Sequence, residues 1–214
     1  KAKSTNTLPK IVIPVHLAGQ SCNMKEIFKL SKEFNFRIIE DAAHAIGAEY
    51  FDKKVGSCVF SDISIFSFHP VKIITTAEGG AALTNNKELA DRMGLFRSHG
   101  ITRDKKLMNK SHNENWYYEQ ISLGFNYRMS DIHAALGRSQ MQRINSFIKK
   151  RSEIAKWYDL QFENTPIKNL SQIEGSKSSY HLYIVRILKG KIERNKLYNL
   201  LNSSGIKANL HYIP

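Results

Sequence analysis

The chain has 214 residues, of which 42% are apolar and 24% are charged, a composition typical of a globular protein with one or two domains. No run of about 18 apolar residues occurs, so the sequence predicts no membrane-spanning helix. The net charge of +13 comes from basic residues scattered along the chain without any nucleic-acid-binding motif. This pattern favours a solvated surface over a nucleic-acid partner.

Residues 10–40 predict a β-α-β unit. The apolar run 10–16 and the run 36–40 each predict a buried strand. Between them, Asn23 is a candidate cap for a helix over 24–33 whose apolar residues share one face. A crossover of this kind joins parallel strands. We therefore expect an α/β fold with a mainly parallel sheet flanked by helices.

The rest of the chain predicts further strands and helices and a second, smaller domain. In chain order we expect a turn at 52–56, strands at 62–68 and 80–84, a helix at 88–96, a long loop at 101–122, a helical region from Ser130 to about 162, a strand at 182–188, a helix at 193–201 ended by Gly205, and a strand at 207–212. We place a domain boundary inside the long helical region. This gives a large domain over 1–145 and a small α+β domain over 146–214.

Two residues at strand ends indicate chemistry. Lys72 follows the strand at 62–68, and Asp41 ends the strand at 36–40. Ligands of open α/β sheets bind at the carboxyl ends of strands. Pyridoxal 5′-phosphate (PLP) needs a lysine that bonds to its aldehyde carbon and an acid that keeps its pyridine nitrogen protonated. The pair therefore predicts a PLP site, against the alternatives of a surface lysine and of an aspartate that caps a helix.

Three other residues near this pair are candidates for the same site. Ala43, in a run of small residues, would let a flat ring approach the backbone. His44 is a candidate to bond the phenolic oxygen of PLP or to stack beside its ring, and the alternative is a satisfied core histidine. Ser67 is a candidate donor to the phosphate of PLP, and the alternative is a serine that faces solvent.

The segments around the lysine and before the long helix add weaker signals. We expect Thr75, Thr76, Gly79 and Gly80 to shape the loop behind Lys72. Asn126 precedes the helical region, but Ser130 can cap that helix, which leaves Asn126 free for another role.

Metal and hydrolase chemistry find no support in the sequence. Neither an HExxH pair nor a Cys/His ligand spacing is present, so we predict no metal site. The GxSxG motif of hydrolases is absent. Cys22 and Cys58 form no CxxC pattern, and the N-terminal residues form no secretory signal. We therefore expect a reducing, cytoplasmic setting.

Taken together, several segments resemble the DegT/DnrJ/StrS family of PLP-dependent nucleotide-sugar aminotransferases. These segments are 39–48, 66–72, 75–80, 95–100, 124–129, 181–183 and 209–214. The resemblance covers essentially the whole chain and implies the PLP-dependent transferase fold type I. It is strongest to the members that aminate C4 of a UDP-linked 4-keto-6-deoxy-N-acetylhexosamine, a step toward pseudaminic acid-like sugars of bacterial surface glycans and flagellin.

The resemblance also implies a role for each candidate. Lys72 would bond to PLP, Asp41 would hold the pyridine nitrogen, and Ala43 and His44 would lie beside the ring. Ser67 would bind the phosphate. Asn126 would reach the phosphate of the neighbouring subunit's cofactor, so the resemblance implies a homodimer with a shared active site. Glutamate would be the amino donor, and a nucleotide sugar the acceptor.

One departure from the family concerns length. Family members carry a long segment before the strand that begins near Lys10, including a helix N-terminus that cradles the PLP phosphate. We therefore expect a fragment with an incomplete large domain and a shortened small domain, which would bind PLP poorly by itself. Two alternatives remain open, a PLP-dependent sugar dehydratase and a non-catalytic remnant or regulatory binding protein. Dehydratases of the family carry histidine at the lysine position, so Lys72 favours transamination.

Overall fold

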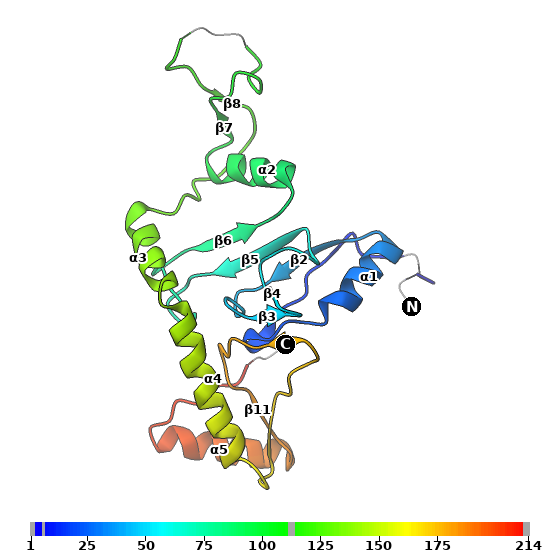
Figure 1. Ribbon diagram of the computed structural model, residues 1–214, viewed down its shortest axis with the longest axis vertical. Helices are drawn as coiled ribbons and strands as arrows, with labels where there is room; N and C mark the ends of the chain where they lie inside the picture. The colour runs from blue at the N-terminus through cyan, green and yellow to red at the C-terminus, as the bar shows by residue number, and fades with distance from the viewer. Residues whose placement is uncertain (1–2, 6, 111–113, 212–214) are drawn as a thin grey trace.

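The computed structural model describes residues 3–5, 7–110 and 114–211, and its centre is a four-stranded sheet (Figure 1). In order across the sheet, the strands are β1 (Ile11–Val12), β2 (Arg37–Asp41), β5 (Ile63–Ser67) and β6 (Gly80–Leu83). β1, β2 and β5 are parallel, and β6 is antiparallel to β5. The α/β fold with a mainly parallel sheet is thus confirmed.

The β-α-β unit forms as predicted, with a shorter first strand. Helix α1 (Met24–Phe34) begins at Asn23, whose side chain accepts a hydrogen bond from the backbone N–H of Glu26. Regular pairing of β1 with β2 stops after Val12 and resumes as one bridge between Val15 and Asp41. The intervening Pro14 has no N–H to give to a ladder.

Smaller sheets and further helices surround this centre. The other elements of the described chain are η1 (Leu17–Gly19), β3 (Glu49–Tyr50), β4 (Lys53–Lys54), α2 (Lys87–Arg97), β7 (Ile101–Thr102), β8 (Glu119–Gln120), α3 (Asp131–Met141), α4 (Ile144–Gln161), β9 (Ile167–Asn169), β10 (Ser176–Lys177), β11 (Val185–Ile187) and α5 (Gly190–Ser203). β10 pairs with the β3–β4 hairpin, β11 with β9, and β7 with β8. None of the described helices is long and apolar enough to cross a membrane.

Two predicted elements in the first half differ from the structure. The turn expected at 52–56 lies earlier, at Phe51 and Asp52, where both residues have positive φ, and Lys53 and Lys54 form a strand. The expected loop at 101–122 has the β7–β8 ribbon at its base. Gly100 has a φ of +67°, and a Cβ there would collide with the backbone carbonyl of Ser122, so a glycine permits this close approach.

The second half also differs from prediction at three places. The long helical region is broken between α3 and α4 by a turn at Gln142 and Arg143. The strand expected at 182–188 is limited to Val185–Ile187. No strand forms over 207–211, and the end of that predicted strand lies outside the described residues. The helix ended by Gly205 is confirmed, because Ser204 is the C-cap of α5 and Gly205 has a φ of +80°.

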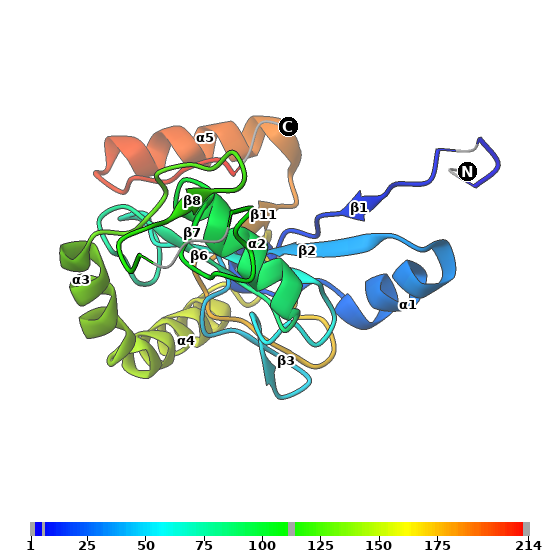
Figure 2. The same cartoon turned by 90° about the horizontal axis from the view of Figure 1, so that it is seen from above.

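The elements form an elongated arrangement around the central sheet. Helices α3 and α4 run along one side of the sheet, and the β7–β8 ribbon projects beyond α2 at one end (Figures 1 and 2). β11 and α5 lie at the opposite end (Figure 1). The division into domains 1–145 and 146–214 stays a prediction, and β10 crosses it by pairing with β3.

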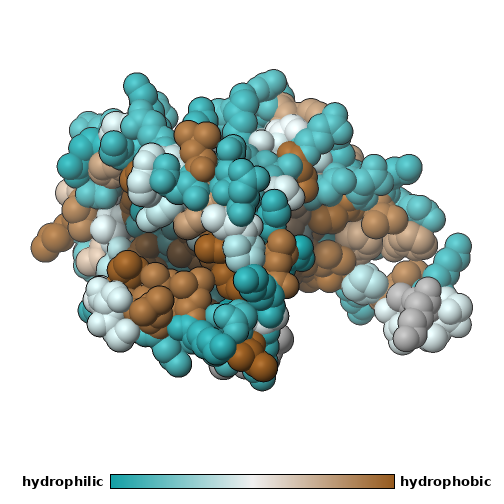
Figure 3. Space-filling view, turned by 90° about the horizontal axis from the view of Figure 1, so that it is seen from below, coloured by the Kyte–Doolittle hydropathy of each residue, from teal (hydrophilic) through white to brown (hydrophobic). Residues whose placement is uncertain are grey.

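The two faces of the central sheet differ in burial. Ile38 of β2 packs with Met24 of α1 and with Tyr50 in one buried cluster. The opposite face carries apolar side chains in contact with solvent, among them Ile13 (59% exposed) and Ile65 (42% exposed). Figure 3 shows apolar side chains gathered along the part of the molecule that extends toward the N-terminal segment. Parallel sheets are usually covered on both faces, so this exposure is unusual.

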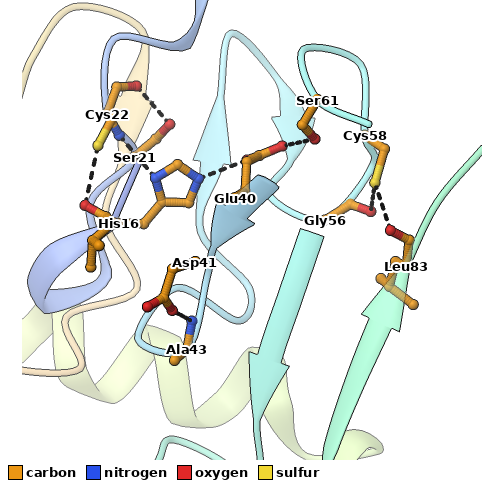
Figure 4. Close-up of polar contacts among 11 residues, drawn as sticks. His16, Ser21, Cys22, Glu40, Asp41, Ala43, Gly56, Cys58, Ser61 and Leu83 are labelled. Atoms are coloured by element: carbon orange, nitrogen blue, oxygen red, sulfur yellow. Dashed lines mark hydrogen bonds and ion pairs between the residues drawn. The ribbon is translucent and has the colours of Figure 1, made fainter. Parts of the chain in front are cut away.

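A buried polar pair, His16 and Glu40, lies on the covered face of the sheet. His16 is fully buried, and its Nε2 lies 2.6 Å from Oε2 of Glu40, whose other oxygen accepts a hydrogen bond from Ser61 (Figure 4). The backbone N–H of Cys22 donates to Nδ1 of His16 at 3.1 Å, which places the ring proton on Nε2, facing the carboxylate. The Glu40 carboxylate is thereby satisfied away from water.

Replacing His16 should destabilise the protein, because the buried Glu40 carboxylate then loses a hydrogen-bond partner. In His16→Phe, Glu40 loses its ring partner, and we expect the free energy of unfolding to fall by about 3–5 kcal/mol, measured by urea denaturation. The double variant His16→Phe/Glu40→Leu should recover most of this loss, because no buried carboxylate then remains. A loss below about 1 kcal/mol in the single variant would contradict this account.

Candidate active site

The backbone around Asp41 is held on both sides of the residue. Its N–H donates to the carbonyl of Pro14 at 2.9 Å, and its carbonyl accepts from the N–H of His16 at 3.0 Å. The carboxylate Oδ1 accepts from the N–H of Ala43 at 3.1 Å (Figure 4). This is an Asx turn, and turns rather than a helix follow it, so the helix-cap alternative for Asp41 is wrong.

The small residues after Asp41 divide between the core and the site. Ala42, Ala45 and Ala48 are fully buried and pack with Phe66 of β5. Ala43 and the adjacent His44 are half-buried and lie outside that cluster. The small alanine side chains therefore allow the turn to pack in the core, while Ala43 and His44 stay accessible to solvent.

Lys72 lies on the loop that joins β5 to β6, and Phe68 closes the base of this loop. The N–H of Phe68 donates to the carbonyl of Gly79 at 2.9 Å. The carbonyl of Phe68 accepts from the N–H of Thr76 at 3.0 Å and from the hydroxyl of Thr75 at 2.9 Å. Thr75, Thr76 and Gly79 thus shape the lysine loop as predicted, and Lys72 is half-buried within it.

His44 connects the lysine loop to Asp41. Burial lowers the pKa of His44, and the Lys72 ammonium lowers it further, while the Asp41 carboxylate acts in the opposite direction. Nδ1 of His44 accepts from the N–H of Ala18 at 3.4 Å, which suits a neutral ring. The structure therefore brings Asp41, His44 and Lys72 into one electrostatic cluster.

A second histidine, His181, packs on the first. The rings of His44 and His181 lie 4.3 Å apart between centroids with a 42° tilt. His181 is 9% exposed, and its Nδ1 has no hydrogen-bond partner among the described residues. Burial, reinforced by His44, Lys72 and Arg151, lowers the pKa of His181 to about 3.

Ser67 and Asn126 are placed differently with respect to this cluster. Ser67 ends β5, and the register of β5 against β2 puts it on the same sheet face as Asp41. Its hydroxyl accepts from the N–H of His69 at 3.4 Å. Asn126 is exposed and forms a backbone bridge with Ser98, and no contact joins it to the cluster within the described chain.

Sequence reasoning missed two residues that support the cluster. Arg151, expected on a solvated surface, is half-buried and donates to the backbone carbonyls of Tyr180 and His181 at 3.0 and 3.2 Å. Ser179 is fully buried and donates to the carbonyl of His44 at 3.3 Å. Nothing in the local pattern distinguishes either residue. Within the described ranges, no three His, Cys, Asp or Glu residues gather as metal ligands.

Comparison with known proteins identifies the family. The model of the DegT/DnrJ/EryC1/StrS aminotransferase family matches residues 2–214. The chain belongs to this family. It spans about half the length of the curated relatives that it matches, 51–54% for the first four.

Named relatives and solved structures agree with this membership. The chain is 43% identical over 202 residues to a UDP-4-amino-4,6-dideoxy-N-acetyl-beta-L-altrosamine transaminase of Campylobacter jejuni, covering 94% of this chain and 51% of that protein. Helicobacter pylori PseC, an aminotransferase of pseudaminic acid biosynthesis, superposes with a TM-score of 0.84 at 38% identity, over 94% of this chain and 52% of PseC. Spr1654 of Streptococcus pneumoniae, solved in PMP and PLP forms, gives TM-scores of 0.83 and 0.81 at 33% and 32% identity, over 96% and 95% of this chain and 54% of each.

The low pKa of His181 makes stability depend on pH in acid. The unfolded chain binds a proton at this ring below about pH 6.5, whereas the folded protein resists doing so down to about pH 3. The ring therefore contributes stability above pH 6.5 that is lost as the pH falls through this window. Between about pH 7 and pH 4, the free energy of unfolding should fall more in the parent than in His181→Phe, by on the order of a few kcal/mol in urea titrations. His133→Phe, on α3, should keep the parental slope, and the same slope in His181→Phe would contradict the assignment.

Proposed function

We propose that the protein is a PLP-dependent aminotransferase that moves an amino group from glutamate to a nucleotide-linked 4-keto-6-deoxy sugar. The observation that carries this proposal is the cluster of Asp41, His44 and Lys72 at the carboxyl ends of β2 and β5. Membership of a PLP-dependent family supports the same conclusion.

The residues present fit PLP by their chemistry. Lys72 supplies an amine on a closed loop, and Asp41 supplies a carboxylate whose orientation is fixed by the N–H of Ala43. His44 supplies a flat ring whose pKa is lowered by burial and by Lys72. When bound, PLP accepts the amino group and draws electrons from the reacting carbon.

Each residue then has a task. Asp41 would hold a proton at the pyridine nitrogen, because a carboxylate stabilises the protonated form. Lys72 would hold the cofactor through its amine and would be the group that takes and returns the proton at Cα of the amino donor. Ala43 would leave room beside the ring, and Ser67, on the same sheet face as Asp41, would donate to the phosphate.

The names of the relatives support a proposal for the acceptor. The Campylobacter protein is named for a UDP-linked amino sugar, and PseC for pseudaminic acid biosynthesis. We therefore propose a UDP-linked 4-keto-6-deoxy-N-acetylhexosamine as acceptor, in cytoplasmic synthesis of a pseudaminic acid-like sugar. We also propose a homodimer in which Asn126 serves the cofactor phosphate of the partner subunit, since Asn126 lies outside the cluster of its own chain.

Trapping with borohydride tests the lysine. The purified chain is mixed with PLP and reduced, and its peptides are analysed by mass spectrometry. We expect a pyridoxyl adduct concentrated on Lys72, because its charge acts on His44, as does that of Asp41, so the three groups belong to one cluster. Lys72→Ala should abolish the adduct, whereas Lys87→Ala, on the exposed start of α2, should leave it unchanged. Adducts spread evenly over the surface lysines would contradict the proposed site.

A comparison of acceptors tests the sugar. With glutamate as donor, kcat/KM should be roughly a hundredfold higher for the UDP-linked 4-keto-6-deoxy-N-acetylhexosamine than for a GDP-linked 4-keto-6-deoxyhexose, because a site that hydrogen-bonds one base leaves polar groups unpaired with the other. Product formation is followed by chromatography. Equal values, or a preference for the GDP-linked sugar, would overturn the proposed acceptor while leaving the aminotransferase assignment intact.

A further inference from the structure

The segment over residues 171–182, called here the strap, is fastened to the large sheet region at several points. Gln20 joins it twice, by donating to the carbonyl of Ser171 and by accepting from the N–H of Ile173, both at 3.2 Å. The Lys177 ammonium lies 3.0 Å from Glu49 and 2.7 Å from Asp52. These contacts fasten the strap to the end of η1 and to the β3–β4 hairpin.

The fastening becomes tighter toward His181. The N–H of Ser179 donates to the carbonyl of Gly19 at 3.0 Å, and its hydroxyl donates to the carbonyl of His44 at 3.3 Å. From α4, Arg151 donates to the carbonyl of His181 at 3.2 Å. The backbones of both histidines are therefore held by hydrogen bonds, and their rings lie 4.3 Å apart between centroids.

We propose that His181 is a positioning residue whose flat ring holds His44 in the orientation it needs beside the cofactor. His44 is half-buried and receives support from the N–H of Ala18 on one side and from the ring of His181 on another. Removal of the second support would leave His44 able to rotate into solvent. This inference rests on the proposed function only in placing the cofactor beside His44.

The ring shape of His181, rather than the Nδ1 atom, carries this role. Nδ1 makes no hydrogen bond among the described residues, so no bond at that atom holds His44 in place. The positive charges of Lys72 and Arg151, together with burial, keep His181 neutral, so it presents an uncharged face to its neighbour. A phenyl ring should therefore replace the imidazole, whereas a side chain without a flat face should not.

Histidine titration by NMR in the protein without PLP tests the inference. In the parent, His44 should titrate below the usual value near 6.5, since burial and Lys72 disfavour its charged form. His181→Phe should keep this low value. His181→Leu should let the value rise toward 6.5, because the His44 ring gains water. The His44 signal is assigned from His44→Gln, and thermal melts confirm that each variant is folded.

Cofactor binding gives the second readout. The aromatic contact predicts that the affinity for PLP falls roughly three- to tenfold in His181→Leu and less than about twofold in His181→Phe. If the parent binds no PLP even when PLP is in large excess, the proposed function fails for this chain, but the titration still decides the role of His181. An unchanged His44 titration in His181→Leu, or equal loss of affinity in both variants, would overturn the inference. His181→Ala replaces the leucine variant if the latter does not fold.

Discussion

The structure depends on the pleat of β2, which points two adjacent acidic residues to opposite faces of the sheet. Glu40 is buried against His16 and Ser61, so the strand cannot slip by one residue without placing another side chain in that polar pocket. Asp41 is consequently directed to the other face, where the strand ends (Figure 4). A buried pair that contributes little net stability thus defines the register that places the Asp41 carboxylate at the end of the strand.

Charge around the site is arranged so that both histidines are neutral. Burial lowers the pKa of both histidines, and Lys72 lowers both further. Arg151 also lowers the pKa of His181, whereas the Asp41 carboxylate acts in the opposite direction on His44. A neutral ring costs less to bury than a charged one. The positive charge of the region is therefore carried by Lys72 and Arg151.

The strand pattern of the sequence predicted the positions of Asp41 and Lys72, but it did not predict the contacts that Arg151 and His181 make. Alternating apolar runs located β2 and β5, and the residues at their ends, Asp41 and Lys72, follow from that pattern because parallel strands end at one edge. The contributions of Arg151 and His181 depend on how a distant segment folds back, and no periodicity encodes that contact. Strand lengths were overestimated for a related reason: an apolar run such as 182–188 shows which residues suit a strand, whereas pairing depends on the partner.

The residues of the site differ in how far apart they lie along the chain. Asp41 and Lys72 are 31 positions apart in sequence, and β2–β5 pairing alone brings their ends together. Contacts over such short separations close with little loss of chain entropy. The strap reaches the same place from more than a hundred residues further along, and it adds orientation to groups already gathered. The chemistry of the cluster is therefore local, while its geometry depends on the long-range contact between His181 and His44.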